Sequence, residues 1–106
     1  MGKHVYLVEL ERGRRNRNYH AFLNNANSLY AKAPDYVGIN NLCLLVHTQD
    51  SNTVHLLMTE SFKGSGSDLK VTEITSDTLN DEHGFHRIFS DTIDYFKRYH
   101  DLTNLT

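Results

Sequence analysis

The first apolar segment of the chain spans residues 4–11 and reads HVYLVELE. Apolar side chains occupy both sets of alternating positions until Glu9, which is typical of a strand that is buried on both faces. The arginine loop, residues 12–17 (RGRRNR), follows directly. The sequence therefore predicts a buried strand whose acidic end meets a basic loop.

Apolar residues then recur at a spacing of three and four, which predicts a helix with one face packed on a sheet. These residues are Tyr19, Phe22, Leu23, Ala26, and Leu29 or Tyr30. We expect Asn16 or Asn18 to cap the start of this helix and Pro34 to end it.

Two further strands are predicted after Pro34. Residues 35–39 form a short run with strand character, and residues 42–48 (LCLLVHT) form a strongly apolar one. Asn40 and Asn41 stand between them, and asparagine tolerates the positive φ values of tight turns. A hairpin is therefore expected in this part of the chain.

Residues 53–62 (TVHLLMTESF) fit the periodicity of a helix and that of a strand. We favour a helix, because Asp50 or Ser51 can cap its start and Lys63 with Gly64 is typical of a helix end. Residues 64–68 (GSGSD) then form a polar connector. Residues 68–75 (DLKVTEIT) alternate as a final strand.

A last helix is predicted from Asn80 or Asp81 to about His100. Its apolar stripe comprises Phe85, Ile88, Phe89, Ile93 and Phe96. Three phenylalanines and the neighbouring tyrosines are more aromatic surface than one small core needs. Phe85, Phe89 and Phe96 either cover the sheet of their own chain or form a dimer interface, where aromatic residues are enriched.

The predicted order of elements is β, α, β, β, α, β and a terminal α. We therefore expect an α+β fold, a single ferredoxin-like βαββαβ sandwich over residues 1–106 with a four-stranded antiparallel sheet and an extra C-terminal helix. Right-handed crossovers place both internal helices on one face of the sheet. The other face is left to solvent, to the last helix or to a second copy of the chain.

Charge is distributed unevenly over the 106 residues, although the formal net charge is only −2. Residues 1–34 carry six basic and two acidic side chains, a net of +4, whereas residues 35–106 carry five and eleven, a net of −6. The charge pattern therefore disfavours a protein that binds nucleic acid over its whole surface. A local basic patch on an acidic body fits the pattern, because phosphates respond to where cations cluster.

The single cysteine, Cys43, lies within an apolar run and is expected to be a buried structural thiol. One unpaired cysteine suits a reducing cytosol. No apolar stretch approaches the length of a membrane span, and the first residues have no signal-peptide core. We therefore expect a cytoplasmic protein that does not contact the membrane.

Two groups of side chains could carry chemistry at the end of the first strand. Glu9 and Glu11 fall on one face, where they either bind Mg²⁺ or act as acid and base, or else pair with nearby arginines. Arginine suits phosphate because its planar fork binds two oxygens, and Asn16, Asn18, Tyr19 and His20 could add hydrogen bonds and a stacking ring. The candidate nucleic-acid-binding residues are Arg12, Arg14, Arg15 and Arg17.

A metal site among the histidines has little support. Glu82, His83 and His86 are spaced to share a helix face, but the local sequence offers no third and fourth ligand of the usual kind. Catalytic triads, glycine-rich phosphate loops and zinc-finger spacings are not evident in the sequence. Surface histidines are the simpler interpretation.

The chain resembles the SinR-like proteins, small relatives of the dimeric ferredoxin-like nuclease subunit of CRISPR spacer acquisition. The resemblance covers about residues 4–76. It lies in a first strand ending Val8-Glu9-Leu10, the helix start Asn18-Tyr19, the strand LCLLVHT with a helix after it, and the strand end Glu73-Ile74-Thr75.

The resemblance implies a homodimer. In the nuclease branch it also implies a symmetric pair of carboxylates that holds a divalent metal, and Glu9 is the matching position. The family pattern has aspartate there, and the extra methylene of glutamate moves the ligand away from the near-octahedral geometry that Mg²⁺ requires.

We therefore favour a small homodimeric module that binds nucleic acid through the arginine loop or binds a protein through its sheet and C-terminal helix. No cofactor is required for such a role. The alternatives are an Mg²⁺-dependent nuclease with Glu9 as catalytic metal ligand, or a regulator of the toxin-antitoxin or phage-encoded type that inhibits a host protein.

Overall fold

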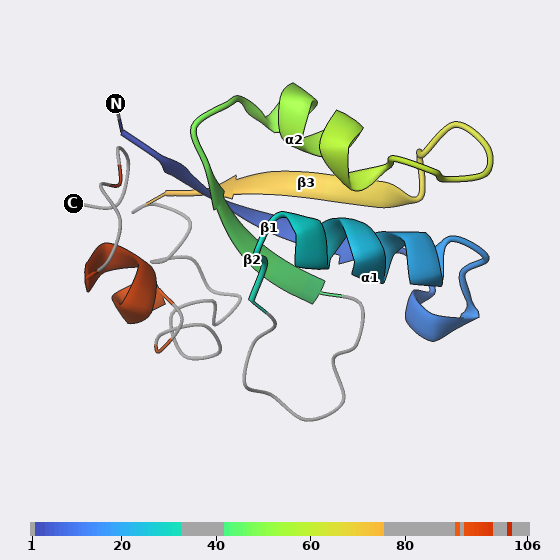
Figure 1. Ribbon diagram of the computed structural model, residues 1–106, viewed down its shortest axis with the longest axis horizontal. Helices are drawn as coiled ribbons and strands as arrows, with labels where there is room; N and C mark the ends of the chain where they lie inside the picture. Colours follow the sequence, from blue (N-terminus) through green and yellow to red (C-terminus); the bar gives the residue numbers. More distant parts are fainter. Residues whose placement is uncertain (1, 33–41, 76–90, 92, 99–101, 103–106) are drawn as a thin grey trace.

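The computed structural model describes residues 2–32, 42–75, 91, 93–98 and 102 (Figure 1). Its elements are strand β1 (His4–Leu10), a short 3₁₀ helix η1 (Gly13–Arg15), helix α1 (Tyr19–Ser28), strand β2 (Leu42–His47), helix α2 (Ser51–Met58) and strand β3 (Leu69–Ile74). Residues 93–98 are also helical. The predictions of an α+β fold, of these three strands and of both internal helices are confirmed.

The sheet has β1 in the middle, with β2 and β3 antiparallel to it on either side. Leu7, near the centre of β1, lies opposite Leu44 of β2 and Thr72 of β3. On the edge of β2 that faces away from β1, Leu44 pairs with Lys32 through two backbone hydrogen bonds of 2.7 Å. The strand expected at residues 35–39 and its turn lie outside the described residues.

Helix α1 differs from the sequence prediction on one side of its apolar stripe and at its end. Phe22 is buried as expected, but Leu23 is 41% exposed because it lies at the edge of that stripe. Tyr30 is exposed and adopts a left-handed φ of 56°. The Ala31 N–H then donates to the Ala26 carbonyl at 2.9 Å. The helix thus ends through this left-handed residue, and Pro34, the predicted stop, lies outside the described residues.

Helix α2 owes its start to Asp50. The Asp50 Oδ1 accepts a hydrogen bond from the Thr53 N–H at 2.9 Å, which satisfies a donor that the first turn would leave unpaired. Val54 and Met58 are fully buried on the inner side of the helix. The preference for a helix over a strand in residues 53–62 is therefore correct.

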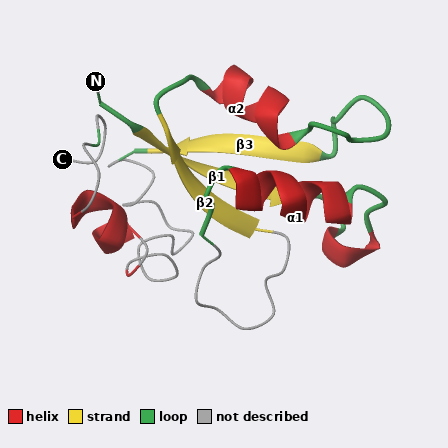
Figure 2. Cartoon of the chain, viewed as in Figure 1, coloured by secondary structure: helices red, strands yellow, loops and turns green. Residues whose placement is uncertain are grey.

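Both described internal helices pack on one face of the sheet (Figure 2). The core on this face is made of alternate residues of the three strands together with Phe22 of α1 and Val54 and Met58 of α2. The strand residues are Tyr6, Val8, Leu10, Cys43, Leu45 and Leu69. Cys43 is buried there as predicted, and burial raises the pKa of its thiol to about 12.

A second core covers the opposite face of the sheet. Val5 and Leu7 of β1, Leu44 and Ile74 of the neighbouring strands, and Ile93, Phe96 and Leu102 of the C-terminal segment form it. Phe96 is 3% exposed, so it covers the sheet of its own chain, the first of the two alternatives given for the aromatic residues. Phe85 and Phe89, the other residues of the predicted interface, lie outside the described residues.

In the part of the chain that the structure describes, none of the helices has both the length and the apolar character that crossing a membrane requires.

Candidate functional site

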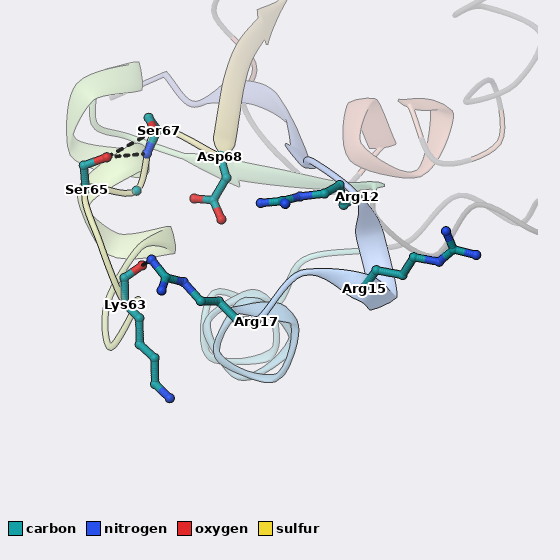
Figure 3. A pocket seen from close by; sticks show the side chains of 8 residues that line it. Arg12, Arg15, Arg17, Lys63, Ser65, Ser67 and Asp68 are labelled. Carbon is teal, nitrogen blue, oxygen red and sulfur yellow. Dashed lines mark hydrogen bonds between the residues drawn. The ribbon is translucent and has the colours of Figure 1, made fainter.

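A cavity of about 390 Å³ lies beyond the end of β1, between the arginine loop and the connector that joins α2 to β3 (Figure 3). It is lined by Arg12, Arg15, Arg17, Lys63, Ser65, Gly66, Ser67 and Asp68. We call it the arginine cavity. Its walls come from two segments of the chain that are far apart in sequence, so the contacts that hold them together decide whether it exists.

Asn16 forms one of these contacts. Its side-chain amide donates to the Glu11 carbonyl at 2.8 Å and to the Asp68 Oδ2 at 2.7 Å, and its Oδ1 accepts from the Asn18 N–H at 2.8 Å. The first and third bonds fold the arginine loop back on itself. The second fastens the loop to the connector.

Asn18 forms the other contact. Its Oδ1 accepts from the Lys63 N–H at 2.7 Å, and its amide donates to the Lys63 carbonyl at 3.0 Å and to the Asp68 Oδ2 at 3.3 Å. Asn18 stands at the N-cap position, directly before α1, yet its side chain makes no capping bond to the helix. The sequence prediction that Asn16 or Asn18 caps α1 is thus correct for the position of Asn18 and wrong for the contact, because both side-chain amides bind the distant connector.

The backbone turns sharply where β1 meets the arginine loop. Arg12 and Gly13 both have left-handed φ values, of 65° and 52°. The Glu11 N–H donates to the Asp68 carbonyl at 2.8 Å. This bond extends the pairing of β1 with β3 by one residue, into the arginine loop side of β1 and the connector side of β3. A left-handed arginine costs about 1 kcal/mol in backbone strain, so this turn is held in place by its surroundings.

Two glycines shape the connector. Gly64 and Gly66 have φ values of 87° and 77°, which side chains rarely adopt. A Cβ on Gly66 would lie 3.0 Å from the Thr59 Cγ2, and one on Gly64 would lie 2.7 Å from a terminal nitrogen of Arg17. Glycine at both positions therefore lets the connector approach α2 and the arginine loop.

Charge in the arginine cavity is mainly positive. Arg12 points toward the Asp68 carboxylate, and Arg17 points toward the connector, where its guanidinium donates to the Lys63 carbonyl at 3.4 Å (Figure 3). Arg15 points away from Asp68 in the same view. Three arginines and a lysine against one carboxylate leave a net charge of +3 among the lining residues.

Asp68 is held in its ionised form. Burial on its own raises the pKa of this carboxyl, but the hydrogen bonds from Asn16 and Asn18 and the charge of Arg12 outweigh burial and bring the pKa below its ordinary value. The carboxylate therefore remains a fixed negative charge in a basic cavity at neutral pH.

The structure brings together three of the four arginines that the sequence singled out. Arg12, Arg15 and Arg17 line the cavity, whereas Arg14 is exposed and does not. Sequence reasoning missed Lys63, Ser65, Ser67 and Asp68 because it treated the connector as a plain linker. Asn16 and Asn18, expected to contact a ligand, are buried and bonded within the chain instead.

Glu9 and Glu11 line a neighbouring hollow of about 370 Å³ together with Leu10, Ser67, Asp68 and Lys70. We call it the acidic hollow. Glu9 is half-buried and Glu11 is exposed in the turn after β1. Within the described ranges neither forms an ion pair with the arginine loop, so the alternative that these acids are neutralised there does not hold for that part of the chain.

The described acidic side chains of a single copy of the chain do not form a metal site. No group of three or more His, Cys, Asp or Glu side chains that could hold a metal occurs among the described residues. Asp68, the nearest third carboxylate, already accepts hydrogen bonds from Asn16 and Asn18. Glu82, His83 and His86 lie outside the described residues.

The two rings expected beside the arginine loop differ in exposure. Tyr19 is half-buried and packs against the core under α1, whereas His20 is exposed. Their rings meet edge to face with centroids 5.8 Å apart. His20 is thus the more accessible of the two for stacking on a ligand.

Comparison of the chain with family models, with curated proteins and with solved structures gives no match. The resemblance to the SinR-like proteins therefore stays a prediction from the residues.

Proposed function

We propose that the protein is a nucleic-acid-binding module that holds phosphate in the arginine cavity. The observation that carries this proposal is that Arg12, Arg15, Arg17 and Lys63, which come from two separate loops, line one cavity. Arg12 and Arg17 point toward its connector wall. Guanidinium groups bind phosphate oxygens in pairs, and a lysine adds a compact charge. Such a cavity is more specific for phosphate than a basic tail, because its walls are fixed.

The way the walls are fixed supports the proposal. The connector lines the cavity with one lysine and one aspartate, Lys63 and Asp68, so charge alone does not hold it against the arginine loop. Here the side chains of Asn16 and Asn18 join the loops through Asp68 and the Lys63 backbone. The cations are thus held together before a ligand arrives, and less of the binding free energy is lost in ordering them.

The finer fold assignment belongs to the same proposal. We infer a ferredoxin-like sandwich, because β1 lies between two antiparallel neighbours and α2 connects β2 to β3 across it. The fourth strand of that fold is the one expected at residues 35–39. Homodimerisation, which the resemblance implies, is expected as well, and sedimentation velocity would measure it as twice the 12.2 kDa mass of the chain.

Binding of a fluorescent single-stranded oligonucleotide at low salt tests the proposal. We expect the double variant Arg12→Asn with Arg17→Gln to bind at least about tenfold more weakly, because two phosphate contacts are lost. Asparagine is chosen for Arg12 since it tolerates a left-handed backbone. Fluorescence anisotropy over a series of salt concentrations gives the affinity and its salt dependence, whose slope should also decrease.

Arg14→Gln is the matched control. Like each of the two single changes, it removes one positive charge from the same loop, but from a side chain that does not line the cavity. It should leave the affinity within about twofold of the wild type. Equal loss of binding in the control, or an unmodified protein that does not bind, would show that the cavity is not a phosphate site.

Metal-dependent hydrolysis is the second activity that the resemblance implies, and the described residues of one chain give it no metal site. Incubation of RNA and DNA with Mg²⁺ or Mn²⁺ would detect such an activity, and a genuine one should disappear in Glu9→Ala.

A further inference from the structure

The arginine cavity and the acidic hollow are neighbours. Both are lined by Ser67 and Asp68, so the basic walls pass directly into a surface that carries Glu9 and Glu11. Three carboxylates and one lysine line the hollow, a net charge of −2, against +3 for the cavity. The sign of the field therefore reverses within the width of this site.

The charge of a nucleic-acid strand does not change sign along its length, because each internal linkage carries one negatively charged phosphate. A strand that ran through the cavity and across the hollow would place a phosphate beside Glu9, Glu11 or Asp68. Like charges close together disfavour that arrangement, and in a partly enclosed site they are less screened by salt. The strand is therefore disfavoured on the side of the hollow.

A terminal phosphate avoids this repulsion and makes better use of the cations. A phosphate monoester carries about −1.5 to −2 charges at pH 7 and three strong acceptor oxygens. An internal phosphodiester carries a single charge. Arg12, Arg17 and Lys63 thus gain more from a monoester, and nothing negative needs to follow it over the acidic hollow.

Resting on the proposed function, we infer that the arginine cavity binds the terminal phosphate monoester of a nucleic-acid strand, at its 5′ or its 3′ end, in preference to internal phosphodiesters. The acidic hollow then faces the sugar or base of the last nucleotide, whose hydroxyl and amino groups donate hydrogen bonds to carboxylates. The site is selective because one wall attracts the end of a strand and the other rejects its continuation.

Four forms of one oligonucleotide test the inference in competition against a labelled strand. They carry a 5′-phosphate, a 3′-phosphate, hydroxyl groups at both ends, or no end at all because the strand is circular. We expect one phosphorylated form to bind about tenfold more tightly than the hydroxyl and circular forms, and the latter two to bind alike. The preference should be larger at pH 7.5 than at pH 5.5, because a monoester loses its second proton near pH 6.

A double variant tests whether the carboxylates of the acidic hollow cause the preference for strand ends. Glu9→Gln with Glu11→Gln should strengthen binding of the circular form and so reduce the preference for ends. Asp91→Asn with Asp94→Asn removes the same net charge from exposed positions that line neither the cavity nor the hollow. This control should leave the preference unchanged, which separates the local field from the charge of the whole molecule.

The outcomes distinguish the inference from the proposed function. Equal affinity for all four forms overturns the preference for ends while phosphate binding stands. A preference that survives in the Glu9 and Glu11 variant overturns the role given to the hollow. Absence of binding for every form overturns phosphate binding itself.

Discussion

Asn16 and Asn18 are only 4% and 2% exposed, although asparagine is mostly a surface residue. Every polar atom of the two side chains has a partner, and no buried side-chain nitrogen or oxygen among the described residues lacks one. Such satisfaction is needed, because an unpaired buried polar group costs about 1–3 kcal/mol. The two residues therefore contribute to the stability of the fold and to the shape of the arginine cavity at once.

Asn18→Ala should lower the free energy of unfolding by about 1–3 kcal/mol, because it removes the two part-buried hydrogen bonds of this side chain to the Lys63 backbone. Urea unfolding followed by circular dichroism measures the loss. Asn24→Ala is the control, since Asn24 is exposed on α1 and alanine favours helices. A similar loss in both variants would mean that α1 itself, and not the contact with the connector, was weakened.

The sequence predicted the arginines of the site but not these asparagines. Arginine reveals its chemistry by type alone, because four guanidinium groups in six residues attract anions in almost any loop. Asparagine does not, since its role depends on its partners. The partners that these two side chains have in the connector lie 45 to 52 residues further along the chain, beyond any local pattern.

Cys43 should be inert in the folded protein. Burial raises the pKa of its thiol to about 12, so almost no thiolate is present at pH 8, and the side chain is also shielded from reagents. We expect negligible alkylation by iodoacetamide over an hour in buffer and complete alkylation in 6 M guanidinium chloride, as measured by mass spectrometry. Because the chain has one cysteine, each product is unambiguous. Rapid modification of the native protein would contradict the buried position.

At the scale of elements, the pattern of apolar residues and the capping residues predicted helices and strands correctly where these signals were strong. Continuous apolar runs predicted β1 and β2, alternation predicted β3, and the Asp50 cap identified α2 within a segment whose periodicity was ambiguous. The end of α1 was missed because it depends on Tyr30, whose left-handed backbone has no signature in a tyrosine side chain. A cap residue therefore predicted a helix boundary where its type is common at that position, as with Asp50, and not where it is rare, as with Tyr30.

The cap of α2 makes the stability of this element depend on pH. Hydrogen bonds from Thr53 lower the pKa of Asp50 below its ordinary value in the folded protein. The stabilisation is therefore present above the pKa of the unfolded chain and is lost as the pH falls through the lower folded value. Asp50→Asn keeps an oxygen that can accept the bond but does not titrate.

We therefore expect wild type to be more stable than Asp50→Asn at pH 6 and the difference to shrink as the pH falls below the ordinary pKa of an aspartate carboxyl. Urea unfolding at several pH values measures it. The lowered pKa of Asp68 acts in the same direction and is common to both proteins. A difference that stays constant with pH would show that the Asp50 charge does not stabilise α2.

At the scale of the whole molecule, the sheet is covered on both faces, by α1 and α2 on one and by the C-terminal segment on the other. The second cover is the thinner in the described part of the chain, so a single aromatic residue should matter greatly there. Phe96→Ala should cost about 3–5 kcal/mol through lost burial and the cavity left behind. Exposed Lys97→Ala should change the stability little, and an equally small effect of Phe96→Ala would argue against the packing of this segment on the sheet.

The charge asymmetry of the sequence predicted a local basic patch, yet it could not predict what lies beside that patch. Lys63 and Asp68 come from the acidic part of the chain, and the fold places both on the wall of the arginine cavity, where Asp68 also lines the acidic hollow with Glu9. The outcome is set by the antiparallel pairing of β1 with β3, which brings the end of one strand to the start of the other. Such pairing is a property of the folded molecule.

The distant origin of the two loops also offers a way to find the natural occupant of the cavity. The two walls of the cavity are tens of residues apart in the sequence, and only folding brings them together. The unfolded chain therefore has no such cavity, and a ligand of the cavity binds the native state alone. A compound at a hundred times its dissociation constant would add about 2.7 kcal/mol to the stability. A melting-temperature screen of metabolites and short oligonucleotides is thus a direct search for the ligand, with Arg12→Asn and Arg17→Gln as the background that should not respond.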